Sequence, residues 1–388
     1  MRRNHAAALA AFTTITLLVA GCGESADESS GSGGDTYTIG YITDATGSQI
    51  ATAVPRVQAA RMAVEDINAS GFLGEGKTLK MVEEDGKADA APSVSAANKF
   101  FGDQNVLAVA CCSLSGVAGA LKPLFQQAKL PLVITTAVLP GLPEPPYIYR
   151  SALLNDTPEG GNGQLAAKAI EVFQPKTVVI VRTADNDGMR AESDVWKSVF
   201  DAKGIPVTVV DTGSKDTDFN GVATQVSGAK PDLVVDSMLG ATAAPFIRAL
   251  RDRGYTGQIL GNVVMGTQQY HDVAGDALDG LVYAAPFTPL TDDPAGKKFV
   301  ERYTAKYGEA PINDAVQGYT AVYLIANALK AAGDNPTRES LAQALSKVTS
   351  FDSLVGTITM TNGQAQGDRF EFVQWGPGGK QQLWQPAG

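Results

Sequence analysis

An alternation of short apolar runs with amphipathic helical patterns begins at Asp35 and constrains the fold more than any other feature. Thr36–Thr43 is typical of a strand, and apolar residues from Val54 to Ile67 then recur at spacings of three and four, as on one face of a helix. Further strands are predicted at 79–83, 106–110 and 130–135, with helices near 90–101 and 116–128.

A second series of the same kind follows Arg150. Thr157-Pro158-Glu159 predicts a helix start, because it places a capping hydroxyl, a proline and a carboxylate in order. Continuous β-branched runs at 177–181, 207–210 and 233–235 favour parallel strands that are covered on both faces. Long helices dominate 293–347, and strands return at 355–360 and 370–375. The pattern predicts an α/β protein with two doubly wound lobes.

Composition and charge exclude several classes of function. With 44% hydrophobic and 19% charged residues, the chain has the composition of a folded protein rather than a disordered one. The net charge of −10 argues against nucleic acid as a partner, because a nucleic-acid site needs a basic face. His5 and His271 are the only histidines, so a histidine-rich metal site is excluded, and we expect neither a metal nor a cofactor.

The N-terminus predicts a bacterial lipoprotein signal. Arg2 and Arg3 precede an apolar stretch that is too short to span a bilayer and ends in Leu-Val-Ala-Gly-Cys at Cys22. We therefore expect a signal peptide over 1–21, lipidation of Cys22 and a flexible Gly/Ser-rich tether over 22–35. The alternative is an ordinary signal peptide with a chance cysteine. The lipoprotein reading predicts an extracytoplasmic protein that is anchored to the membrane by lipid.

Two motifs match known patterns in the wrong context. Residues 71–78 fit the phosphate-binding pattern G-x-x-x-x-G-K-[ST], but a helix precedes them and a strand follows, the reverse of the order that phosphate binding requires. Asp216, Asp218 and Asn220 begin an EF-hand pattern that lacks its final glutamate. We expect ordinary turns at both places.

Cys111 and Cys112 are adjacent, and their Cα atoms should lie about 3.8 Å apart, closer than in most disulfides. We favour two small buried thiols at the end of a strand. The alternative is a vicinal disulfide, which an oxidising compartment would permit.

Three segments together resemble a known family. Tyr37–Glu84 contains a strand, a Thr-Gly turn and a helix that ends in VEDINASG, and Cys112–Pro140 contains a serine-bearing turn, a helix and LPLVITTAVLP. FDSLVGTITMTNG and FEFVQW lie near the C-terminus. In order and spacing, these resemble the type I periplasmic solute-binding proteins of the branched-chain amino acid and amide class, which feed ABC importers. The resemblance spans Thr36 to Trp375.

The resemblance implies two Rossmann-like lobes that are joined by three hinge crossings and close on a small ligand. By position, the crossings fall near Ala152–Asn155, Ala285–Phe287 and Asp352–Gly356. The N-terminal lobe would then comprise 36–153 plus 287–353, and the C-terminal lobe 154–286 plus 354–388. An importer permease would be the partner, and the protein would be a monomer without enzymatic activity.

The resemblance also assigns ligand-binding positions in the first lobe. Ser115, with Ser113 as the alternative, would contact a ligand carboxylate, together with a stretch whose members are Thr136, Ala137 and Val138. A helix that starts at Gly116 would direct free N–H groups at the same anion.

Other positions depart from the family pattern. Thr52 occupies the position of an aromatic residue in the family, and Asp187 and Leu239 occupy two tyrosine positions. Val263 occupies the position of the acidic residue that contacts the ligand's ammonium group. Asp187 either replaces that acid or is an ordinary loop residue. Val138, Leu239 and Val263 would form an apolar wall, so the ligand could be a less polar acid or an amide.

Three other functions remain as alternatives. A sensor that signals to a membrane partner could use the same scaffold, and a structural lipoprotein would bind no ligand. An extracytoplasmic enzyme would need Ser115 and His271 as nucleophile and base, but no nucleophile-elbow motif accompanies them.

Overall fold

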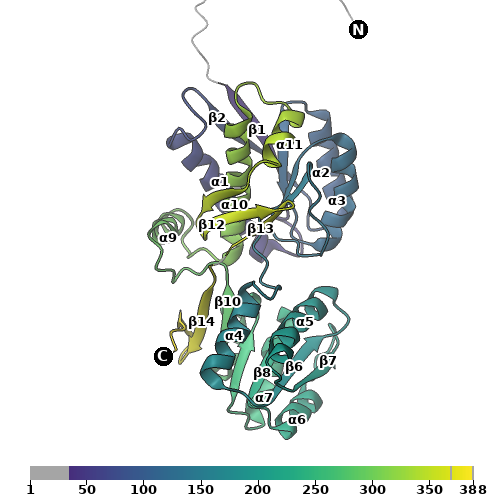
Figure 1. The fold of residues 1–388 in the computed structure, drawn as a ribbon, viewed down its shortest axis with the longest axis vertical. Helices are drawn as coiled ribbons and strands as arrows, with labels where there is room; N and C mark the ends of the chain where they lie inside the picture. Colours follow the sequence, from purple (N-terminus) through teal and green to yellow (C-terminus); the bar gives the residue numbers. More distant parts are fainter. Residues whose placement is uncertain (1–34, 368, 387–388) are drawn as a thin grey trace, which may run out of the picture. The chain divides into compact units, whose positions relative to one another are not determined.

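The computed structural model describes residues 35–367 and 369–386. The predicted signal peptide, most of the tether and Cys22 lie outside the described residues. The described elements form two sheets, each with helices on both faces (Figure 1). The predicted fold class, two Rossmann-like doubly wound lobes, is confirmed.

The first lobe is built on an eight-stranded sheet. Its strands are β1 (Thr36–Thr43), β2 (Thr78–Asp85), β3 (Val106–Cys111), β4 (Leu132–Ile134), β5 (Ile148–Arg150), β11 (Ser350–Ser353), β12 (Gly356–Thr361) and β13 (Gln364–Gln366). Its helices are α1 (Ile50–Ala69), α2 (Ala90–Gly102), α3 (Ser115–Ala128), α9 (Pro294–Tyr307), α10 (Asn313–Ala332) and α11 (Arg338–Leu345). The strand order is β11-β12-β13-β5-β4-β3-β1-β2, with β1 to β5 parallel to one another.

The second lobe is built on a seven-stranded sheet. Its strands are β6 (Val178–Thr183), β7 (Val207–Thr212), β8 (Leu233–Ser237), β9 (Gln258–Gly261), β10 (Val282–Ala285), β14 (Glu371–Gly376) and β15 (Lys380–Leu383). Its helices are α4 (Gly161–Phe173), α5 (Asp187–Ala202), α6 (Asn220–Ala229), α7 (Gly240–Asp252), α8 (Gln268–Ala274) and the short 3-10 turns η1 (Val263–Gly266) and η2 (Gly275–Leu278). The strand order is β15-β14-β10-β9-β8-β6-β7.

Continuous apolar strands supply both faces of each sheet. Along β6, Val179 and Val181 belong to the core under α6 and α7, while Val178 and Ile180 belong to the core under α4 and α5. The same division holds in the first lobe, where α1 and α10 cover one face of the sheet and α2 and α3 the other. Burial on both faces explains why these strands lack strict alternation.

The third crossing between the sheets is not where the sequence predicted it. Gly356–Thr361 and Gln364–Gln366 pair within the first sheet, and Gln364 aligns with Arg150 of β5. The chain therefore passes to the second sheet after Gln366, and not near Asp352–Gly356. The expectation was wrong because an apolar strand pattern shows that a strand forms but not which sheet accepts it.

The first helix of the second lobe also starts later than predicted. Thr157–Gly160 form a turn, and α4 begins at Gly161. The turn folds over the helix start so closely that a Cβ on Gly163 would lie 2.1 Å from the Pro158 carbonyl oxygen. As expected, residues 71–77 form turns between α1 and β2. Residues 216–219 form an irregular loop that leads into α6 at Asn220, and the turn lies just before them at 214–215.

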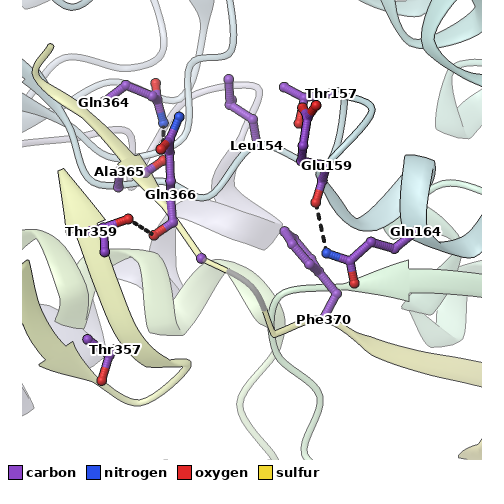
Figure 2. Close-up of a pocket in the computed structure, with 12 residues that line it drawn as sticks. Leu154, Thr157, Glu159, Gln164, Thr357, Thr359, Gln364, Ala365, Gln366 and Phe370 are labelled. Carbon is purple, nitrogen blue, oxygen red and sulfur yellow. Dashed lines mark hydrogen bonds between the residues drawn. The ribbon is translucent and has the colours of Figure 1, made fainter. Parts of the chain in front are cut away.

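A cavity of about 680 Å³ lies where the first crossing meets β12 and β13 (Figure 2). Leu154, Glu159 and Phe370 contribute to its lining. None of the predicted ligand-binding residues is among the residues that line it.

Close packing of α1 on α10 yields a stability prediction. A Cβ on Gly318 of α10 would lie 2.1 Å from the Arg56 carbonyl oxygen of α1, so the helices would have to separate. Gly318→Ala should lower the free energy of unfolding by about 1–3 kcal/mol, as overpacking does. Urea denaturation measures this change.

Gly119→Ala is the matched control, because a Cβ on Gly119 in α3 would meet no atom within 4 Å. We expect it to raise stability by up to about 1 kcal/mol through helix propensity. Equal effects of the two substitutions would contradict the close-packing argument.

Candidate functional site

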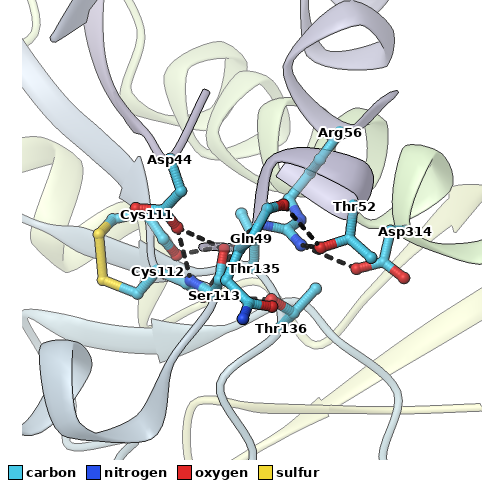
Figure 3. A network of polar contacts seen from close by, with 10 residues as sticks. All are labelled: Asp44, Gln49, Thr52, Arg56, Cys111, Cys112, Ser113, Thr135, Thr136 and Asp314. Atoms are coloured by element: carbon cyan, nitrogen blue, oxygen red, sulfur yellow. Dashed lines mark hydrogen bonds and ion pairs between the residues drawn. A yellow bond between two sulfur atoms is a disulfide. The ribbon is translucent and has the colours of Figure 1, made fainter. Parts of the chain in front are cut away.

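The carboxyl ends of β1, β3 and β4 lie side by side and bring the predicted first-lobe residues together. Ile42 aligns with Cys111, and Cys111 aligns with Ile134, so the loops after these strands leave the same edge of the sheet. Ser113 follows β3, and Thr136 follows β4 (Figure 3). Loops at the carboxyl ends of parallel strands are the usual ligand-binding positions in such sheets.

A buried guanidinium joins these loops to two helices. Arg56 of α1, only 4% exposed, donates to the Ser113 hydroxyl at 2.5 Å and to Asp314 of α10 at 2.7 Å. Ser113 in turn donates to the carboxylate of Asp44, which also accepts the Ala88 N–H at 2.8 Å. The contacts link Arg56 to the ends of β1 and β3 (Figure 3).

Most hydroxyl groups at this edge are occupied within the protein. The Ser113 hydroxyl is used between Arg56 and Asp44. The Thr52 hydroxyl donates to the Gln49 carbonyl oxygen at 3.2 Å, and the Thr136 hydroxyl donates to the Cys112 carbonyl oxygen at 3.2 Å. Ser115 differs, because its oxygen accepts the Leu139 N–H at 3.1 Å and its proton remains available for donation.

A second buried cation lies beneath the loop after β4. Arg150 of β5, 3% exposed, donates to the carbonyl oxygens of Ala137 at 3.0 Å and Leu139 at 3.1 Å, on either side of Val138. It forms no ion pair among the described residues, and burial lowers its pKa to about 10. Arg150 therefore contributes positive charge at the loop that the sequence assigns to an anion.

Cys111 and Cys112 form a disulfide, with Cα atoms 3.7 Å apart. Our preference for two free thiols was wrong, and the alternative of a vicinal disulfide is what the structure contains. The prediction failed because it treated the Cα separation usual for disulfides as a requirement, whereas that range describes most disulfides and not all of them.

The second-lobe residues also lie at strand ends. Asp187 begins α5 after β6 and pairs with Arg190 one turn later. Leu239 follows β8 and donates its N–H to the Thr183 hydroxyl at 3.1 Å, and Val263 follows β9 as the first residue of η1. His271 stacks on Trp375, at 5.8 Å between ring centroids.

Buried carboxyl groups accept hydrogen bonds from residues at or near these strand ends. Glu192 of α5 accepts the Ser237 hydroxyl at 2.8 Å and the Asn262 side-chain amide at 3.3 Å. Ser237 lies two residues before Leu239, and Asn262 lies one residue before Val263. Asp236 of β8 is fully buried and accepts the Met238 N–H at 3.0 Å.

Burial governs the protonation of this group. Desolvation raises the pKa of Asp236 to about 8 and that of Asp156 in the first crossing to about 6. It also raises the pKa of Glu192 well above its ordinary value, and the nearby Asp156 charge adds to the effect. At neutral pH Asp236 therefore keeps a proton that it would lose in water.

Several of these residues were missed by the sequence argument. Arg56 carries a detectable signal, because it interrupts the apolar face of its helix with a charge. No local sequence signal identifies Arg150, Asp236 and Glu192, because their roles depend on partners far away in the chain.

Apolar side chains surround the candidate site in the first lobe. Ile50 at the start of α1 is 53% exposed, and Val138 and Leu139 after β4 are 41% and 39% exposed. In the second lobe Val264, next to Val263, is 43% exposed. Among the described residues, no group of three or more His, Cys, Asp or Glu side chains could bind a metal ion.

Comparison with known proteins identifies the family. The family model described as periplasmic binding protein matches residues 36–380, and the chain belongs to this family. It is a solute-binding protein and not an enzyme.

Individual relatives are similar over most of their length. The Leu/Ile/Val-binding protein BraC3 of Rhizobium johnstonii is 26% identical over 88% of this chain and 92% of the relative. A branched-chain amino acid transporter substrate-binding protein from Streptococcus pneumoniae, solved with isoleucine, is 21% identical with a TM-score of 0.74 and covers 91% of this chain and 100% of its own. A solute-binding protein from Rhodopseudomonas palustris, solved with 3,4-dihydroxybenzoic acid, is 22% identical with a TM-score of 0.74 and covers 88% and 93%.

The raised pKa values predict a pH-dependent stability. A carboxyl that keeps its proton when folded loses stability as pH rises from its unfolded pKa of about 4 towards the folded pKa of about 8 for Asp236. Wild-type stability should therefore fall between pH 5 and pH 8. Asp236→Asn should remove at least about 1.4 kcal/mol of that fall, the equivalent of one pKa unit. Urea denaturation at both pH values measures the difference.

Asp211→Asn is the control, because Asp211 is an exposed carboxylate on β7 of the same sheet. It should leave the difference between pH 5 and pH 8 unchanged. If Asp236→Asn also leaves it unchanged, Asp236 is already ionised in the folded protein at pH 5.

Proposed function

We propose that this protein is the lipid-anchored receptor of an ABC importer and captures a small carboxylate with an apolar body between its two lobes. The chemistry of the first-lobe strand ends carries the proposal. Arg150, which has no ion-pair partner among the described residues, contributes a positive charge at 137–139, and Ser115 begins α3 with a hydroxyl proton available for donation. Free N–H groups in the first turn of a helix favour an anion at the same place.

The predicted second-lobe positions support an apolar ligand body. Leu239 and Val263 stand where the resemblance implies polar partners of an amino acid, and Val264 beside them is exposed. Val138 and Leu139 present apolar side chains in the first lobe. A ligand with a carboxylate and without an ammonium group matches these residues better than a free amino acid does.

The similar proteins support an importer role and give two ligand classes to test. The relative from Rhizobium johnstonii is named for leucine, isoleucine and valine, and the Rhodopseudomonas palustris protein was solved with an aromatic acid. In this proposal the lobes close by rotation at the crossings over 151–160 and 286–293 and at the third crossing after Gln366. Asp187, at the entrance to α5, is then a surface residue whose charge is satisfied by Arg190.

Ligand binding is tested by thermal shift and calorimetry with isoleucine, 3,4-dihydroxybenzoate and the amide of that acid. A ligand that binds should stabilise the folded protein by about 2.7 kcal/mol at a hundredfold excess over Kd. We expect the acid to bind, and the neutral amide to bind more weakly because it lacks the charge that Arg150 attracts. Tighter binding of isoleucine than of the acid would overturn the ligand class and leave the receptor role intact.

Ser115→Ala tests the anion contact. Loss of a hydroxyl that donates to a charged group should weaken carboxylate binding by about 1.5–3 kcal/mol. Ser198→Ala on α5 is the control, because the single partner of the Ser198 hydroxyl among the described residues is the Val195 carbonyl oxygen of its own helix. Equal affinities of the Ser115 variant and the wild type would remove Ser115 from the site.

Lipid anchoring makes a separate prediction at Cys22. Among the described residues, no helix is long and apolar enough to cross a bilayer. Cys22→Ser removes the thiol that would carry the lipid, so it should transfer the protein from the membrane fraction to the soluble fraction without changing ligand affinity. Mass spectrometry of the wild-type N-terminus should find an acylated Cys22. An unmodified N-terminus at another residue would reject the lipid anchor and leave the proposed receptor role intact.

A further inference from the structure

The Cys111–Cys112 disulfide lies where β3 passes into the proposed ligand loop of the first lobe. Both cysteines are buried, and Ser113 follows them directly. Cys112 has a φ of +89°, whereas the other non-glycine residues with positive φ lie between +47° and +57°. The latter range belongs to the left-handed helical region, and Cys112 lies beyond it, where side chains other than glycine are strained.

This backbone conformation directs the Cys112 carbonyl at the neighbouring loop. Its oxygen accepts the N–H groups of Thr136 at 3.3 Å and Ala137 at 3.2 Å, and the Thr136 hydroxyl at 3.2 Å. The Cys111 carbonyl oxygen accepts the Thr135 N–H at 2.7 Å and the Thr135 hydroxyl at 3.0 Å. The two cysteines thus supply the acceptors for three consecutive residues of the loop after β4.

The same loop contains the residues of the proposed anion contact. Leu139 donates its N–H to Ser115, and the Ala137 and Leu139 carbonyl oxygens accept from Arg150. The position of the Cys112 carbonyl therefore determines where Val138 and its flanking groups lie relative to the start of α3.

We propose that the Cys111–Cys112 disulfide is a positioning element of the ligand site, which keeps Cys112 in its positive-φ conformation so that its carbonyl orders residues 135–137. The covalent ring spans a single peptide bond and restricts the backbone of both cysteines. Without it, a non-glycine residue at position 112 relaxes towards negative φ and withdraws its carbonyl. The link to affinity rests on the proposed function, and the link to loop order does not.

Two variants of the full chain distinguish the effect of the disulfide ring from the effect of the backbone conformation at position 112. Cys111→Ser removes the disulfide and leaves a non-glycine residue at position 112. The double variant Cys111→Ser with Cys112→Gly also lacks the disulfide, but glycine adopts positive φ without strain. Lys129→Gly at the end of α3, where φ is +51°, is the control for adding a glycine at another positive-φ position.

Amide hydrogen exchange of the peptide that covers 132–139, measured by mass spectrometry, reports loop order without any ligand. We expect exchange in Cys111→Ser to be at least about tenfold faster than in the wild type, the factor that corresponds to 1.4 kcal/mol. The double variant should exchange within about threefold of the wild type, and Lys129→Gly should exchange as the wild type does. Wild-type exchange in Cys111→Ser, or fast exchange in the double variant, would overturn the proposal.

Folding failure also gives a result. If Cys111→Ser does not fold while the double variant folds with wild-type exchange, glycine has replaced the ring, as proposed. If neither folds, the disulfide has a role that backbone conformation does not explain, and the proposal fails. Peptide mapping of the wild type without reductant must find both sulfurs resistant to alkylation, and alkylation of both would reject the disulfide itself.

Affinity is measured in parallel with isoleucine and 3,4-dihydroxybenzoate. The probe that binds the wild type should bind Cys111→Ser at least about tenfold more weakly and should regain its affinity in the double variant. An unchanged affinity in Cys111→Ser would separate loop order from binding and overturn the positioning role. If neither probe binds the wild type, that result counts against the proposed ligand class, and the exchange result stands by itself.

Discussion

The arrangement of the first lobe depends on one buried cation. Arg56 contacts Ser113 and Asp314, and through Ser113 it reaches Asp44, so a single guanidinium connects α1, α10 and the ends of β1 and β3. Burial of a charge is costly unless its partners are close and well oriented. The helices and the strand ends must therefore lie close enough together to surround Arg56, and in this arrangement they form the edge of the candidate site.

The two lobes support their strand ends by different electrostatic means. The first lobe uses an ion pair at Arg56, whereas in the second lobe burial raises the pKa of carboxyls such as Glu192 and Asp236. A protonated carboxyl avoids most of the desolvation penalty of a carboxylate and can still accept hydrogen bonds from Ser237 and Asn262. Stability of the second lobe is consequently linked to pH, and that of the first lobe depends on ion pairing.

Several polar side chains near the candidate site are already hydrogen-bonded within the protein, so they are not available to a ligand. Ser113, Thr52 and Thr136 are polar, but their hydroxyl protons are used by Asp44, Gln49 and Cys112. Ser115 and the Arg150 charge remain, among exposed apolar side chains such as Val138. Such a surface suits a ligand that is charged at one end and apolar along the rest, because few polar groups are left to pay for desolvating a second charge.

The sequence by itself determined the succession of strands and helices and the first-lobe strand ends that carry Ser113, Ser115 and Thr136, because hydrophobic periodicity and turn residues are local signals. Only the tertiary structure decided that β12 and β13 join the first sheet, that Cys111 and Cys112 are bonded, and that Arg56, Arg150 and Glu192 support the site. Strand pairing and the partner of a buried charge depend on residues far apart in the chain, and no local pattern records which of them will meet.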